Sequence, residues 1–234
     1  MISNAEIKMV RSLREKKFRD GLGLFVVEGE KMVQEALDSG LTVEKVWRRD
    51  DIGEAAMGRI SQFSTPSPAL AVVRMPAHTA APVPSGLCLA LDAVRDPGNM
   101  GTIIRLSEWF GVGTLYLSPD CVDIYNPKVI QATMGAIFRV RTVTAPIPEV
   151  CRSFRSRGIK VFGTFLDGSS IYSAELPESA LVVMGNESNG ICADVAAEVD
   201  AKLLIPSFGP SRSESLNVSV ATAVTLSEFR RRSI

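Results

Sequence analysis

Histidine and paired cysteines are scarce in this sequence. Its 234 residues include one histidine, His78, and four widely separated cysteines that form no CxxC pair. A lone histidine excludes a metal site built on several histidines and argues against a Ser-His-Asp triad. The cysteine spacing argues against disulfides and against a zinc knuckle. We therefore expect no metal site, and a chemistry that relies on other groups.

Long apolar runs and a net charge are also missing. No run approaches the ~20 apolar residues of a membrane-spanning helix, and the N-terminal residues lack the apolar stretch of a secretory signal. The 26 basic and 26 acidic residues cancel, and 46% of the chain is hydrophobic. These features predict a globular protein of the cytoplasm with no membrane partner.

Charge is nevertheless clustered locally. Residues 8–19 contain six basic side chains and one acid, Glu15. Such clusters are what phosphate binding requires, although the solvated face of a helix explains them equally well.

Residues 76–85 hold three prolines and no strong periodicity, which is typical of a linker. Before this linker, short apolar runs at 24–27, 43–47 and 70–73 predict strands, and the spacing over 28–37 predicts a helix. Residues 1–75 thus form a small α/β domain, and residues 86–234 form a second domain.

The second domain has a regular rhythm. Apolar runs at 87–91, 114–117, 160–165, 181–184 and 202–205 predict strands, and helical patterns cover 101–110, 127–137, 148–157 and 216–230. Alternation of this kind predicts an α/β fold with a parallel sheet covered on both faces. Ligands bind beyond the carboxyl ends of such strands, so the loops that follow the strands are the place to look for chemistry.

Three of these loops carry unusual residues. The first, DPGNMGTIIR (96–105), contains a Pro-Gly turn, an asparagine placed to cap a helix that begins near Gly101, and Arg105 about one turn into that helix. The second, GNESNG (185–190), has glycines that allow backbone amides to approach a ligand. Taken singly, each is also explained as an ordinary capped helix or loop.

The third loop runs from Pro206 through a Pro/Gly stretch into a helix whose first turn holds Ser215 and Asn217. Small residues follow at 219, 221 and 223, and they allow other backbone to pack closely. A capped helix accounts for Ser215 but not for Asn217, which stands among apolar neighbours. This loop is the most informative of the three.

Together, DPGNMGTIIR, GNESNG and IPSFG…SLNVSVA (205–221) resemble the three signature motifs of the SpoU (TrmH-like) branch of the SPOUT RNA methyltransferases, in the same order and strand-loop context. Residues 126–128 and 134–136 resemble a further segment of that family. Residues 11–37 resemble the L30e-like RNA-binding domain that many members carry, so the resemblance spans nearly the whole chain.

This resemblance implies transfer of a methyl group from S-adenosylmethionine to a ribose 2′-hydroxyl of RNA. It also implies a SPOUT domain with a C-terminal trefoil knot, preceded by an L30e-like substrate-binding domain, and a homodimer that forms through the catalytic domain. The matching catalytic positions are Asn99, Arg105, Glu187, Ser215 and Asn217, and the matching cofactor positions are Thr164, Leu166, Gly185, Ile205 and Leu216.

Arg105 matches the family's catalytic arginine, which is thought to engage the RNA phosphate and help remove the hydroxyl proton. Because a guanidinium stays protonated in proteins, stabilisation of the developing alkoxide or of the adjacent phosphate is the easier role. For RNA contact we expect Arg11, Arg14, Lys16, Lys17 and Arg19.

The substrate remains open at this point. Ribosomal RNA is favoured over transfer RNA, because the first domain resembles those of ribosomal enzymes. A catalytically silent RNA-binding or ribosome-assembly factor is one alternative. A nucleotide-cofactor enzyme with a doubly wound sheet is another, although the GxGxxG fingerprint is missing. The eight residues between Pro206 and Ser215 make this loop longer than in many members, which could change the RNA entrance.

Overall fold

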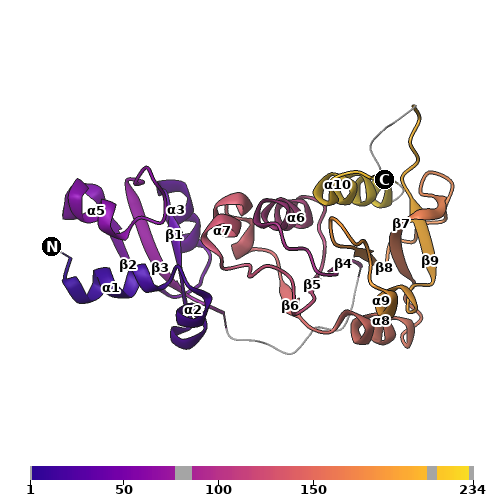
Figure 1. Ribbon diagram of the computed structural model, residues 1–234, viewed down its shortest axis with the longest axis horizontal. Helices are drawn as coiled ribbons and strands as arrows, with labels where there is room; N and C mark the ends of the chain where they lie inside the picture. The colour runs from indigo at the N-terminus through magenta and orange to yellow at the C-terminus, as the bar shows by residue number, and fades with distance from the viewer. Residues whose placement is uncertain (1, 77–85, 210–214, 232–234) are drawn as a thin grey trace. The chain divides into compact units, whose positions relative to one another are not determined.

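The computed structural model describes residues 2–76, 86–209 and 215–231, and the predicted linker lies almost wholly outside them. The chain divides into two units (Figure 1). One comprises Met1–Thr79 together with Asp123–Arg139, and the other comprises Ala80–Val122 and Val140–Ile234.

The first unit is built on an antiparallel sheet with the strand order β1-β3-β2. These strands are β1 (Leu24–Glu28), β2 (Val43–Arg48) and β3 (Ala69–Arg74). The helices before and between them are α1 (Asn4–Ser12), α2 (Lys16–Leu22), α3 (Glu30–Asp38), α4 (Arg49–Ile52) and α5 (Glu54–Ile60). The small α/β domain predicted from the sequence is confirmed.

Side chains alternate across strand β1, so it contributes to two cores. Val26 joins a cluster with residues of α1 and α5 and with the buried Trp47. Phe25 points to the other face, where its ring centroid lies 4.7 Å from that of Tyr125 and 6.4 Å from that of Phe138.

Those two aromatic residues belong to a segment that lies far along the chain. It contains α7 (Pro127–Thr133) and a 3-10 turn, η1 (Ala136–Phe138). The sequence predicts one helix over 127–137, but Met134 adopts a φ of 51° and ends α7. Asp123–Arg139 thus completes the first unit, although the sequence analysis assigns it to the second domain.

The second unit contains a fully parallel sheet with the strand order β6-β5-β4-β8-β7-β9. Its strands are β4 (Leu87–Leu91), β5 (Leu115–Leu117), β6 (Thr142–Thr144), β7 (Val161–Ser170), β8 (Ala180–Met184) and β9 (Ala201–Leu204). This confirms the predicted parallel α/β fold. The sequence analysis missed β6, because its three residues are too short to show a pattern.

Helices cover both faces of this sheet (Figure 1). On one face, α8 (Ile147–Arg155) and α9 (Ala193–Ala196) pack on alternate residues of the central strands, among them Ala90, Tyr116 and Val183. On the other face lie α6 (Pro97–Trp109) and α10 (Val218–Arg231), which contact each other. Phe229 of α10 meets Phe162 of β7 edge to face at 5.4 Å. The predicted packing on both faces is therefore confirmed.

Strand β7 contacts β9 twice. Thr164 pairs with Leu203, and after a register shift Ser169 and Ser170 pair with Leu203 and Leu204. Gly168 lies at the return point, where a Cβ would come 2.7 Å from the carbonyl carbon of Lys202. Only glycine allows so close an approach of two backbones.

Candidate active site

The carboxyl ends of β4 and β8 are adjacent in the sheet, and the loops after them meet. Asp96 caps α6, because its Oδ1 accepts a hydrogen bond from the Asn99 backbone N–H at 2.8 Å, and Pro97 occupies the first helical turn. The prediction that Asn99 caps a helix beginning near Gly101 was wrong. Asp96 caps one turn earlier, which leaves the Asn99 side chain free for other contacts.

That side chain joins the three loops predicted from the sequence. Asn99 Nδ2 donates to Glu187 Oε1 of the second loop at 3.0 Å. Asn217 Nδ2, from the third loop, donates to Asn99 Oδ1 at 2.9 Å. Three residues that are far apart in the sequence therefore form one hydrogen-bonded chain at one edge of the sheet.

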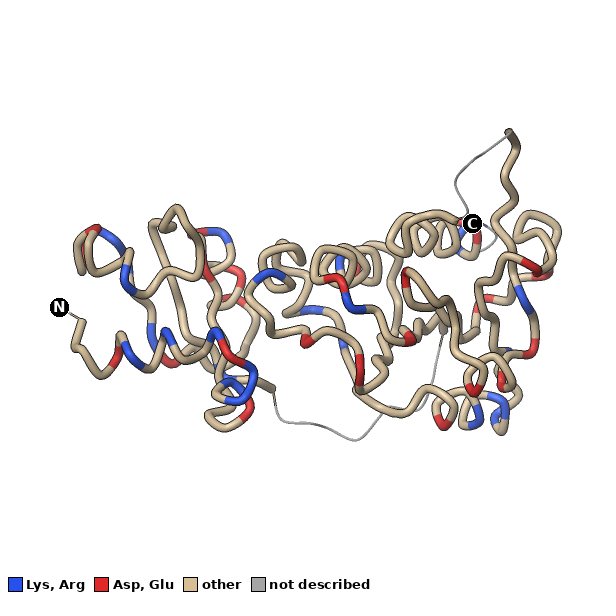
Figure 2. The backbone as a smooth tube through the Cα atoms, in the orientation of Figure 1, with Lys and Arg blue, Asp and Glu red and all other residues tan. Residues whose placement is uncertain are grey.

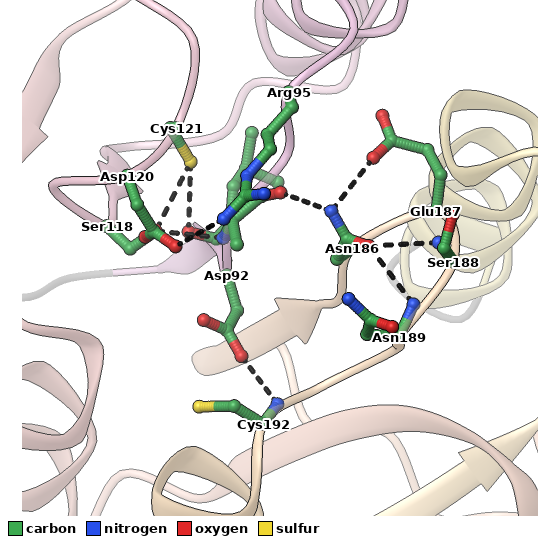
Figure 3. Close-up of polar contacts among 12 residues, drawn as sticks. Asp92, Arg95, Ser118, Asp120, Cys121, Asn186, Glu187, Ser188, Asn189 and Cys192 are labelled. Carbon is green, nitrogen blue, oxygen red and sulfur yellow. Dashed lines mark hydrogen bonds and ion pairs between the residues drawn. The ribbon is translucent and has the colours of Figure 1, made fainter.

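The second loop is a tight turn that closes on itself. Asn186 Oδ1 accepts from the N–H groups of Ser188 and Asn189 at 2.9 and 3.0 Å (Figure 3). Gly185 starts the turn, and a Cβ on it would lie 2.3 Å from the carbonyl carbon of Gly190. The requirement for glycine at 185 thus comes from the return of the loop onto its own backbone.

The third loop reaches α10 through Asn217. Its Oδ1 accepts from the Ser219 N–H at 2.9 Å and from the Ser219 hydroxyl at 2.6 Å, so Asn217 caps α10. The sequence placed Ser215 and Asn217 inside the first turn, but the helix begins at Val218. Ser215 is exposed, and the structure records no hydrogen bond to it within the described residues.

Because α6 begins at Pro97, Arg105 lies more than two turns into the helix and not about one turn, as the sequence predicts, and it is exposed. Across the described ranges, no hydrogen bond or ion pair holds its guanidinium, and none joins it to the chain of Asn99, Glu187 and Asn217. An exposed arginine that has no partner among the described residues is available to an anionic ligand.

Of the predicted cofactor positions, Gly185 and Ile205 directly follow β8 and β9, Thr164 and Leu166 lie within β7, and Leu216 precedes α10. Thr164 Oγ1 contacts the Val183 carbonyl oxygen at 3.5 Å, Gly185 is buried, and Ile205 directly follows β9. Leu166 and Leu216 are 70% and 51% exposed. Apolar side chains beside backbone amides suit an adenosine and a methionine chain, so these residues fit S-adenosylmethionine.

Several residues of this site were missed by the sequence analysis. Buried Asp92 accepts the Cys192 N–H at 2.7 Å and so ties the first loop to the chain after GNESNG (Figure 3). Asn186 Nδ2 donates to the Ala93 carbonyl at 2.7 Å. Their position in the sequence could have identified them, because a polar residue that follows a buried strand lies at the sheet edge where ligands bind.

Three of the four cysteines are poor nucleophiles. Burial raises the pKa of Cys151 to about 12, and burial also raises the pKa values of Cys121 and Cys192. Their thiols therefore stay protonated at neutral pH. Within the residues that the structure describes, no group of three His, Cys, Asp or Glu side chains is arranged to hold a metal ion, and no helix is long and apolar enough to span a membrane.

The predicted RNA-binding residues fall into two groups. Exposed side chains on α1, α2 and the turn between them are Arg11, Arg14, Lys16 and Lys17. Acidic side chains lie close to the basic ones in this part of the chain (Figure 2), and Lys16 pairs with Asp20 at 2.6 Å and Lys17 with Glu15 at 3.0 Å. Exposed pairs of this kind are weak and exchange readily for phosphate.

Arg19 differs from its neighbours and corrects the prediction. It is 2% exposed, it donates to the carbonyl oxygens of Leu13 and Arg14 at 2.8 Å, and it pairs with Asp123. Its guanidinium is committed to the first unit and cannot reach a nucleic acid. Charge clustering alone could not distinguish this buried arginine from the exposed ones.

Comparison with known proteins adds two family matches. Residues 86–227 match the SpoU rRNA Methylase family, and residues 4–62 match the MRM3-like substrate binding domain. The first match covers more than half of the chain and contains all three loops described above.

Individual relatives agree with these matches. The chain is 31% identical to a 23S rRNA (guanosine(2553)-2′-O)-methyltransferase of Bacillus subtilis, over 97% of this chain and 96% of the relative. A solved structure of a putative TrmH-family RNA methyltransferase from Porphyromonas gingivalis is 41% identical, covers 99% of both chains and has a TM-score of 0.90.

A further solved structure bears on the cofactor. An AdoMet-bound rRNA methyltransferase from Sinorhizobium meliloti is 28% identical, covers 100% of this chain and 97% of its own, and has a TM-score of 0.89. These findings confirm the family, the enzyme class and the cofactor that the sequence motifs predict. The chain belongs to the SpoU rRNA methylase family.

Proposed function

We propose that this protein transfers the methyl group of S-adenosylmethionine to the 2′-hydroxyl of a ribose in ribosomal RNA. The observation that carries the proposal is the chain of hydrogen bonds from Glu187 through Asn99 to Asn217. It ties the three family loops together on the sheet edge where such folds bind ligands, and Arg105 of α6 stands exposed in the same unit.

The bound cofactor supplies an electrophilic methyl group on a sulfonium sulfur. The role of the protein is to place the ribose oxygen in line with that group, and positioning of this kind can contribute several kcal/mol, up to roughly 7–11 in ideal cases. Arg105 would bind the adjacent phosphate or the developing oxyanion. Asn99, Glu187 and Asn217 would fix the loops around the sugar, and Ser215 offers a hydroxyl that makes no hydrogen bond to any residue that the structure describes.

For the cofactor we propose Thr164, Leu166, Gly185, Ile205 and Leu216. Leu166 and Leu216 would lose their solvent-exposed area against the adenosyl group. The trefoil knot remains a prediction, since residues 210–214 of the third loop lie outside the described part of the chain.

For the RNA we propose that residues 1–75 form the substrate-binding domain, with Arg11, Arg14, Lys16 and Lys17 on phosphates. The family match at residues 4–62 and the names of the relatives favour ribosomal over transfer RNA. An enzyme of this kind would act in the cytoplasm, where bacterial ribosomal RNA is made.

The proposal is tested by mixing the protein with methyl-labelled S-adenosylmethionine and either unmodified ribosomal RNA or transfer RNA. We expect label in ribosomal RNA, and calorimetry should detect cofactor binding without RNA. Label in transfer RNA alone would show that the substrate is transfer RNA and not ribosomal RNA. RNA binding with neither label nor cofactor binding would instead identify a silent RNA-binding factor.

We further propose a homodimer through the second unit. Trp109 at the end of α6 is 85% exposed and Val220 on α10 is 50% exposed. Nearby, a groove of about 460 Å³ is lined by Phe110, Tyr172, Ala223, Val224, Ser227 and Glu228. An exposed apolar face of this kind on two adjacent helices is typical of a subunit interface.

Val220→Glu should convert this dimer to a monomer, because it places a charge in the centre of the apolar face. Sedimentation velocity measures the change. Leu37→Glu is the matched control, since Leu37 is an equally exposed apolar residue of α3 in the other unit. A monomeric wild-type protein, or a Val220→Glu protein that remains dimeric, contradicts the proposed interface.

A further inference from the structure

Ala93 has a backbone conformation that residues with a Cβ seldom adopt. It follows strand β4 by two positions and has a φ of 57°. Within the described residues, Met134 is the one other non-glycine with a positive φ. Because the left-handed region is unfavourable for alanine, surrounding contacts must hold the residue there.

Two side chains from the neighbouring strands provide those contacts. The Ala93 N–H donates to Ser118 Oγ at 2.8 Å, and the Ala93 carbonyl oxygen accepts from Asn186 Nδ2 at 2.7 Å. Ser118 directly follows β5 and Asn186 follows β8, and these strands flank β4 on its two sides. Both polar groups of the Ala93 residue are therefore held, one from each side.

Both side chains are themselves fixed (Figure 3). Ser118 Oγ donates to Asp120 Oδ1 at 2.6 Å, and the Asp120 carboxylate pairs with Arg95 at 3.5 Å. Asn186 Oδ1 accepts two N–H groups of its own turn, so its amide nitrogen is oriented toward Ala93. We name Ser118, Ala93 and Asn186 the Ala93 clamp.

The clamp lies directly before the residues that enter the active site. Val94 is buried after Ala93, Asp96 caps α6, and Asn99 makes the contacts that join the three loops. If Ala93 relaxed to a negative φ, the chain would leave β4 in a different direction and carry Asn99 and Arg105 with it.

We propose that Ser118 and Asn186 are positioning residues for methyl transfer, which hold Ala93 in the left-handed conformation and thereby aim the loop from β4 into α6. This inference rests on the proposed function for its kinetic readout. The alternative is that each side chain serves only its own loop, Ser118 through Asp120 and Asn186 through its turn.

Substitution of Ala93 separates the two possibilities, because glycine adopts the left-handed conformation without a clamp. Ser118→Ala removes the acceptor, and Asn186→Asp removes the donor but keeps the oxygen that accepts the turn. In the protein with Ala93 unchanged, we expect each of these two substitutions to lower kcat about tenfold. The Kd for the cofactor should change by less than about twofold. In an Ala93→Gly background the same substitutions should lower kcat by less than about threefold.

Equal losses of kcat in both backgrounds overturn the proposal, and so does full activity of both single variants. Ser156→Ala is the control, since its hydroxyl donates to the carbonyl oxygen of Ser153 in α8, away from the clamp. Ala93→Val provides a second test if a clamp variant fails to fold. A β-branched residue resists positive φ, so kcat must fall although Ser118 and Asn186 are unchanged.

The midpoint of thermal unfolding is recorded for the same set of variants. If the wild-type protein methylates no RNA, the proposed function fails, while the clamp is still judged from these midpoints. A clamp predicts that Ser118→Ala and Asn186→Asp lower the midpoint less in the Ala93→Gly background than in the natural one. Equal shifts in both backgrounds overturn it.

Discussion

Arg105 combines exposure with the absence of a protein partner within the described residues, so its removal should leave the fold intact. We expect Arg105→Ala to lower kcat by roughly 10²–10³, the usual loss for one transition-state donor. The cofactor Kd and the unfolding midpoint should stay unchanged. Arg105→Lys should recover part of the rate, because it keeps the charge but loses the planar fork. An Arg105→Ala enzyme of full activity contradicts the assigned role.

Glu6 gives a prediction on pH. The Lys45 ammonium and the backbone and hydroxyl of Ser3 hold the pKa of Glu6 down at about 2, from an ordinary value of 4.5. A lowered pKa stabilises the fold above the unfolded-state value, and this contribution is lost as the pH falls from about 4.5 toward 2.

Lys45→Met should therefore move the pKa of Glu6 up toward 4.5. It should also weaken the capping box that Ser3 and Glu6 form at the start of α1. Carbon-detected NMR titration of the Glu6 carboxyl measures the shift. An unchanged titration curve in the variant would show that Lys45 is not the main cause.

The sequence predicted the roles of some site residues but not of others. Asn99, Glu187 and Asn217 were found because their motifs were recognised, and the structure brings them together. Asp96 was passed over as the helix cap because Asp-Pro-Gly-Asn offers two cap residues three positions apart. Only the observed bond to the Asn99 N–H distinguishes them.

Helix α7 and its flanking residues show what hydrophobic periodicity cannot predict. The periodicity of residues 127–137 indicates a helix but not the surface it packs on. Packing against Phe25 of β1 joins residues about one hundred positions apart, and nothing in local spacing encodes such a contact. Strands β4 and β8 were predictable because both of their faces are buried, which gives continuous apolar runs.

The ion pair between Arg19 and Asp123 should contribute strongly to the attachment of this segment. Arg19→Met leaves a partly buried carboxylate without its partner, so the free energy of unfolding should fall by about 3 kcal/mol. Arg11→Met on the exposed face of α1 should change it by less than about 0.5 kcal/mol. Chemical denaturation measures both. Equal stability of the two variants would show that the segment does not depend on Arg19.

For RNA binding we expect the reverse order, with a larger effect at Arg11 than at Arg19. Arg11→Met should weaken RNA binding and lower its salt dependence, because an exposed cation that meets a phosphate releases counterions. Arg19→Met should leave the salt dependence unchanged, since its guanidinium is buried in the first unit.

The two units carry different parts of the proposed machinery. The first carries the exposed basic residues of α1 and α2, and the second carries the three loops and Arg105. Residues 123–139 belong to the first unit although the chain on both sides of them belongs to the second. The chain therefore passes between the units three times, and the sequence alone, with one visible linker, indicated a single passage.

The most direct measurement is the chemical position of the transferred methyl group. Ribosomal RNA labelled by this protein is digested in alkali, which cleaves every bond that has a free 2′-hydroxyl beside it. The account predicts that the label stays in one alkali-resistant dinucleotide and that Arg105→Ala greatly slows its appearance. Label recovered in single nucleotides would place the methyl group on a base, and it would contradict the proposed geometry of the three loops around a ribose.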